Sequence, residues 1–207
     1  MYRSLLVPLD GSAFAEHALP LALGIARRAG AALNVVQVHV PFALMYADSL
    51  SPGSYEVEAR VLEQERASLD GTVKRLTTAS SVPVTAALLE GPVVAEMLSG
   101  HAVATKADLV VMTSHGRGPL SRFWLGSVAD EMVRRATTPI LLVRPQKAAP
   151  DFTAEPVLRH VLVPLDGSAL AEEVLESAAR AERVDVALAR KEELQEADAP
   201  VATPQPF

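Results

Sequence analysis

The sequence contains no cysteine, one tryptophan, and no long apolar run. Without cysteine the chain has no disulfides, thiol nucleophiles or cysteine-ligated metal sites. No stretch approaches the roughly 18 consecutive apolar residues that a membrane-spanning helix requires. The first residues, MYRSLLVPLDGSA, are interrupted by Pro8 and Asp10 and are not typical of a signal peptide. We therefore expect a cytoplasmic protein that does not bind membranes.

The sequence also lacks an excess of basic residues. Its 207 residues include 19 Lys and Arg against 25 Asp and Glu, which gives a net charge of -6. General nucleic-acid binders usually carry a basic excess that neutralises phosphates, so we expect no nucleic-acid partner. The five histidines show no paired metal-ligand spacing, and no metal site is expected. A hydrophobic content of 49% is ample for a folded core.

Short apolar runs alternate with segments of helical periodicity. The pattern predicts strands over residues 4–9, 32–40, 82–89, 108–112 and Pro139 to Val143. It predicts helices over residues 12–30, where Pro20 should cause a bend, and over 55–79, 93–105 and 127–136, with a loop over 41–54. The fold class is α/β: a doubly wound five-stranded parallel sheet with helices on both faces. In such sheets ligands bind beyond the carboxyl ends of the strands.

A glycine-containing stretch, TSHGRGPLSRFWLGS, separates the fourth predicted strand from the next helix at residues 113–127. Amides in the first turn of a helix have no intrahelical acceptor, and the helix dipole adds partial positive charge there. Glycine lets a phosphate approach the backbone closely. The stretch therefore predicts a phosphate site at Gly126 and Ser127; the alternative is a tight loop followed by an ordinary helix cap. No G-x-x-x-x-G-K-[ST] motif occurs.

The beginning of the chain is repeated near its end. The sequence RSLLVPLDGSAFAE at residues 3–16 returns as RHVLVPLDGSALAE at residues 159–172. We predict a complete module over residues 1–145, a linker over 146–158 and a truncated second copy over 159–207. That copy should hold one strand, a helix over 168–197 and a disordered tail. It is either a degraded helical appendage or a strand and helix that complete a sheet on another chain.

Three motifs together resemble the universal stress protein family in its ATP-binding form: VPLDGS after the first strand, HV at residues 39–40, and SHGRGPLSRFWLGS. The family's nucleotide motif is Gly, two residues, Gly, nine residues, then Gly followed by Ser or Thr. Gly116 and Gly126 with Ser127 match the last three positions, and Thr113 stands at the first. The likeness covers residues 1–145 and, as a truncated copy, 159 to about 180.

The resemblance implies a stress-response regulatory protein that binds ATP together with a divalent cation, expected to be Mg²⁺. Pro8 and Asp10 would line the pocket, with the Asp10 carboxylate directed towards the ribose, and Val40 would offer backbone groups to adenine. The remaining positions implied for the loop and the phosphates are Thr113, Gly116, Gly126, Ser127 and Val128. A homodimer through the last strand, Pro139 to Val143, is also implied. No catalytic residue is expected, and ATP hydrolysis would be slow at most.

Two alternatives remain open at this point. Asp10 could cap the first helix or form an Asx turn with Gly11 and Ser12 instead of facing a ligand. The whole protein could be a nucleotide-free dimeric interaction module of the same family. Thr113 favours that alternative, because a β-branched residue narrows the space at the first glycine position and avoids positive φ.

Overall fold

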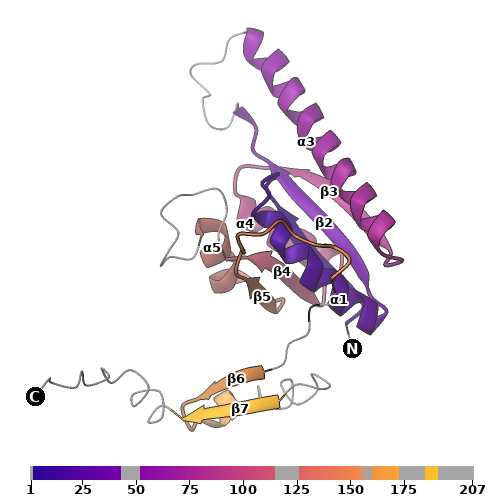
Figure 1. Ribbon diagram of the computed structural model, residues 1–207. Coiled ribbons are helices and arrows are strands. Elements are labelled where there is room, and N and C mark those ends of the chain that lie inside the picture. Colours follow the sequence, from indigo (N-terminus) through magenta and orange to yellow (C-terminus); the bar gives the residue numbers. More distant parts are fainter. Residues whose placement is uncertain are drawn as a thin grey trace, which may run out of the picture. The chain divides into compact units, whose positions relative to one another are not determined.

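The computed structural model describes residues 2–42, 52–114, 126–154, 156, 160–172 and 185–190 (Figure 1). The chain divides into two units, Met1–Pro156 and Val157–Phe207. The strands of the first unit are β1 (Ser4–Leu9), β2 (Ala32–His39), β3 (Val84–Glu90), β4 (Leu109–Thr113) and β5 (Ile140–Val143). Its helices are η1 (Ala15–Ala18), α1 (Leu19–Ala29), α3 (Pro52–Ala79), α4 (Val94–Ala104) and α5 (Ser127–Arg135).

The strands of the first unit form one sheet in the order β3-β2-β1-β4-β5. All four pairings are parallel, as helical crossovers between successive strands require. β1 is the central strand, and Leu5, Leu6 and Val7 within it are fully buried. The predicted doubly wound five-stranded parallel sheet is therefore confirmed.

Successive side chains of the central strand enter two separate cores. Leu5 and Val7 pack in a cluster that includes residues of η1, α1 and α3. Leu6 packs in a second cluster with residues of α4 and α5. Because neighbouring side chains of a strand point to opposite faces, this division places helices on both faces of the sheet (Figure 1). Among the described residues, no helix is long and apolar enough to span a bilayer.

The predicted bend at Pro20 is wrong. Residues 15–18 form the short 3₁₀ helix η1, and α1 begins only at Leu19, so Pro20 lies in its first turn. A proline in that position costs little, because the amide it lacks would have no intrahelical acceptor. Where the sequence predicted one bent helix, the structure has two successive helices that meet just before Pro20.

Asp108 ties the start of β1 to the start of β4. Its Oδ2 accepts the backbone N–H of Arg3 at 2.6 Å and that of Ser4 at 3.0 Å. The hydrogen bonds from these two amides hold the pKa of Asp108 below its usual range, and the bond from Arg3 has the larger effect. The carboxylate thereby links the amino ends of the neighbouring strands β1 and β4.

We expect D108N to be less stable than the wild type at pH 7, with the difference shrinking at acid pH. Because the pKa is lower in the folded chain, this stabilisation is present above the unfolded pKa of about 4 and is lost as pH falls through the folded pKa. Urea unfolding followed by circular dichroism at pH 7 and pH 3 measures it. D70N, at an exposed position of α3, is the control. A stability difference that does not change with pH would contradict the prediction.

The second unit contains β6 (His160–Leu165), α6 (Ala169–Glu172) and β7 (Asp185–Arg190). β6 ends in the same turn as β1: Asp166 accepts the N–H of Ser168 at 2.9 Å, and Gly167 has φ 82°. The predicted helix over residues 168–197 is wrong in its later part, because residues 185–190 form a strand parallel to β6. Its alanines favour a helix locally, but strand β6 supplies backbone groups that require hydrogen-bond partners, and pairing satisfies them.

Candidate functional site

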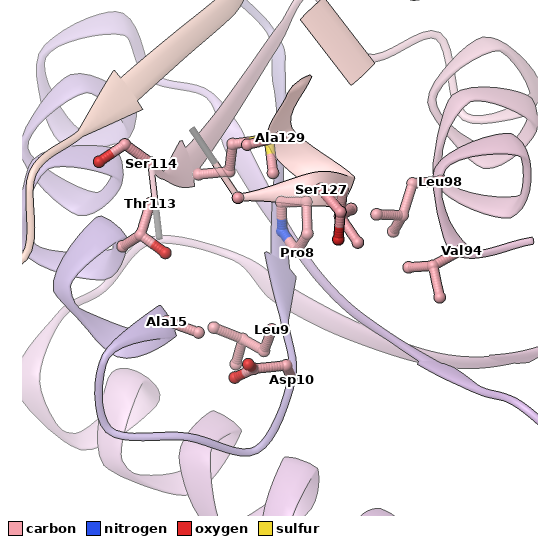
Figure 2. Close-up of a pocket in the computed structure, with 13 residues that line it drawn as sticks. Pro8, Leu9, Asp10, Ala15, Val94, Leu98, Thr113, Ser114, Ser127 and Ala129 are labelled. Atoms are coloured by element: carbon pink, nitrogen blue, oxygen red, sulfur yellow. The ribbon is translucent and has the colours of Figure 1, made fainter. Parts of the chain in front are cut away.

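A cavity of about 400 Å³ opens at the carboxyl ends of β1 and β4 (Figure 2). This is the edge of a parallel sheet at which ligands are expected. Among the described residues, four parts of the chain contribute to it: the end of β1 with η1, the end of β4, the start of α4 and the start of α5. The lining residues are Pro8, Leu9, Asp10, Ala15, Val94, Leu98, Met112, Thr113, Ser114, Gly126, Ser127, Val128 and Ala129.

The turn after β1 fixes the acidic side of the cavity. Asp10 Oδ1 accepts the backbone N–H of Ser12 at 2.9 Å and also its hydroxyl, while Ser12 Oγ accepts the N–H of Ala15 at 3.2 Å. Gly11 has φ 74°, which a residue with a Cβ adopts only with strain. Asp10 therefore forms an Asx turn and lines the cavity at the same time, so the two interpretations of this residue are compatible.

The N-terminus of α5 forms the opposite side of the cavity. Gly126 is its N-cap residue, and in the described part of the chain no side chain caps this helix end. The N–H of Gly126 donates to Ser114 O at 2.8 Å, which holds the start of α5 beside the end of β4. Ser127 and Val128, in the first turn, line the cavity. Their amides and the helix dipole make this side suitable for an anion.

Thr113 and Ser114 line the cavity where β4 ends. Thr113 is the last residue of β4 and is 8% exposed. Its β-branched side chain takes up space that a glycine at this position would leave open, while its hydroxyl keeps the surface polar. Figure 2 shows Thr113 and Ser114 on one side of the space and Ser127 on another, with Asp10 and Ala15 below.

An apolar wall of the cavity was not predicted from the sequence. Val94 and Leu98 lie four residues apart at the start of α4, so both are on one face of that helix. Met112 and Ala129 extend the same apolar lining. Because α4 follows β3, the N-terminus of α4 lies at the carboxyl edge of the sheet. The order of these two elements in the sequence could therefore have indicated that Val94 and Leu98 line the cavity. The wall can cover an apolar or aromatic ring surface.

The structure brings together six of the eight site residues that the sequence analysis names, namely Pro8, Asp10, Thr113, Gly126, Ser127 and Val128. Val40 follows β2 and is not among the residues that line the cavity. Gly116 lies outside the described residues. His39, the neighbour of Val40, has a buried ring that contacts α3. Its Nδ1 is 2.8 Å from Glu65 Oε2, and its Nε2 is 3.5 Å from Glu58 Oε1.

Comparison with known proteins agrees with this arrangement. The sequence profile of the universal stress protein family matches residues 1–144. A universal stress protein of Methanocaldococcus jannaschii is 33% identical over 150 residues, which are 71% of this chain and 85% of the relative.

Two solved structures are also similar. A universal stress protein family member from Burkholderia pseudomallei is 30% identical, with a TM-score of 0.54 over 69% of this chain and 96% of its own. A universal stress protein solved in complex with cAMP is 25% identical, with a TM-score of 0.51 over 70% of this chain and 98% of its own. The profile match and the 33% identity together show that the chain belongs to the universal stress protein family.

Proposed function

We propose that this chain is a stress-response regulatory protein that binds adenine nucleotides, including ATP, in the cavity between β1, β4 and α5. One observation carries the proposal: Asp10 is more than 100 residues from Thr113 and Gly126 in the sequence, yet all three line a single cavity. The similar protein solved with cAMP supports an adenine nucleotide as the class of ligand.

Each part of a nucleotide has a chemically suitable surface in this cavity. The amides of Ser127 and Val128 at the start of α5 suit a phosphate. The Asp10 carboxylate can accept hydrogen bonds from ribose hydroxyls. The apolar wall of Val94 and Leu98 provides a surface on which a ring can pack. Val40 and Gly116 remain proposed contacts to adenine and to the ribose and phosphates.

A divalent cation would enter together with the nucleotide. The described residues contain no group of three His, Cys, Asp or Glu side chains that could hold a metal ion. Mg²⁺ keeps several waters and is commonly bound through substrate phosphates with one or two carboxylates. Phosphate oxygens would therefore be the main ligands of the cation. We propose no enzymatic activity beyond slow ATP hydrolysis.

Calorimetric titration of the purified chain with Mg-ATP, AMP and cAMP tests the proposal. We expect saturable binding of at least one of these ligands. GTP is the control that tests selectivity for adenine over guanine. Failure of all three adenine nucleotides to bind at millimolar concentration would refute it. Mass spectrometry of ligands that remain bound during purification would identify the natural nucleotide.

The second candidate is a nucleotide-free interaction module, and the observation that favours it is the β-branched Thr113 in the cavity wall. T113G separates the two functions. If the wild type binds adenine nucleotide, we expect T113G to bind it at least as tightly, because the substitution enlarges the cavity at the position where the family's motif has glycine. Binding by T113G alone would favour the interaction module as the native function.

We also propose that the protein forms a homodimer through Pro139 to Val143. β5 is at the edge of the sheet, pairs with β4 along one side, and exposes 37% of Leu142. An edge strand with an exposed apolar side chain is a template for pairing with a second chain.

We expect L142D to shift the dimer towards monomer, because two carboxylates would be brought together across a twofold axis. Light scattering coupled to size-exclusion chromatography measures the mass. V133D, at an exposed valine of α5, is the control. A monomeric wild type would exclude the homodimer. An L142D variant that remains fully dimeric would place the interface elsewhere.

A further inference from the structure

Within the first unit, the chain beyond β5 packs against η1 and α1. We call residues 148–154 together with Pro156 the clasp. His17 Nε2 of η1 is 2.8 Å from Ala148 O, and Arg27 of α1 donates to Ala154 O at 2.9 Å. Arg28 donates to Pro156 O at 3.4 Å. The clasp lies beyond residue 144, where the match to the family profile ends.

Phe152 anchors the clasp. It is 8% exposed and belongs to the core cluster on the η1 and α1 face of the sheet. The guanidinium of Arg75, from α3, lies over the ring at 5.2 Å from its centroid. Arg75 also forms an ion pair with Glu16 of η1. The clasp is thus connected to η1 both through His17 and through Arg75.

η1 also contributes to the cavity. Ala15 lines the cavity, and its N–H donates to Ser12 Oγ. Ser12 in turn donates to Asp10, the residue proposed to face the ribose. A continuous series of contacts therefore runs from the clasp through η1 and the Asx turn to the wall of the cavity.

We propose that the clasp sets the position of η1 and thereby the affinity of the cavity for nucleotide; the effect on affinity rests on the proposed function. A clasp in place holds Ala15 and Asp10 at the cavity wall. A displaced clasp removes the hydrogen bond to His17 and the ring under Arg75, so η1 loses two supports. Binding linkage is reciprocal, so bound nucleotide also holds the clasp in place.

The test uses the full chain and two clasp variants. F152A removes the buried anchor, and R27M removes the donor to Ala154 O while leaving every residue of η1 and of the cavity lining as it is. Y55A, at an exposed aromatic residue of α3, is the control. Circular dichroism establishes that each variant is folded. Hydrogen exchange of residues 13–18 without nucleotide measures the order of η1, and calorimetry with AMP and Mg-ATP measures affinity.

We expect F152A to exchange faster at η1 and to bind nucleotide about fivefold more weakly or worse, and R27M to change both quantities in the same direction by a smaller factor. In the wild type, nucleotide should slow exchange in residues 148–154. Unchanged affinity in both variants would overturn the proposal, as would unchanged exchange at η1. If the wild type bound no nucleotide, the proposed function would fail together with the effect on affinity, and exchange at η1 would still decide whether the clasp controls η1.

Discussion

G126V is expected to lose nucleotide binding and keep its fold. Gly126 has φ -59° and ψ 148°, a conformation that valine adopts without strain. A branched side chain at this position would project beside the first-turn amides of α5, where the phosphate is proposed to bind. We expect Kd to rise at least about 100-fold, which corresponds to about 2.8 kcal/mol. Calorimetry with the best-bound adenine nucleotide measures the change.

G100V is the matched control for that experiment. Gly100 is an exposed residue of α4, and a Cβ placed on it meets nothing within 4 Å. Valine is also no worse than glycine for helix stability. We therefore expect G100V to fold and to bind nucleotide as the wild type does. Wild-type affinity in G126V would place the phosphate site away from α5, and an unfolded G126V would show that the glycine serves the fold.

A chain that ends at residue 149 is expected to be several kcal/mol less stable than a chain that ends at Pro156. The shorter chain lacks Phe152, whose ring is buried in the core and stacked under Arg75. It also lacks the carbonyls that accept from Arg27 and Arg28. Removing a buried phenylalanine side chain costs about 3–5 kcal/mol. Urea unfolding followed by circular dichroism compares the two chains.

F152A in the chain that ends at Pro156 is the control for this comparison. It should reproduce most of the loss, because the buried ring is the largest group that the truncation removes. Equal unfolding midpoints for the two truncated chains would show that the clasp does not stabilise the first unit. A chain ending at Pro156 that failed to fold would show instead that the second unit is required.

The sequence was sufficient to predict the sheet and to place Asp10 and Gly126 at the same edge of it. β1, β2 and β4 are short apolar runs bounded by turn residues, and alternation with helices leaves a parallel sheet as the solution. Asp10 and Gly126 are expected at one edge of that sheet, because the carboxyl ends of parallel strands meet there. These features depend on local pattern and on a general rule of topology, and the structure places them as predicted.

Other features depend on packing between distant segments, and only the tertiary structure determined them. Alanine-rich residues 185–190 read as helix, yet they form β7 because β6 supplies backbone groups that need partners. Val94 and Leu98 became part of the cavity through the position of α4. Phe152 lies in an Ala- and Pro-containing segment typical of a linker, and its burial depends on contacts with α1, η1 and Arg75. The sequence by itself determined the elements of the first sheet. Tertiary packing decided which side chains meet, because no local period encodes a contact such as that of Arg75 with Phe152 or of Arg27 with Ala154, which are more than 70 residues apart.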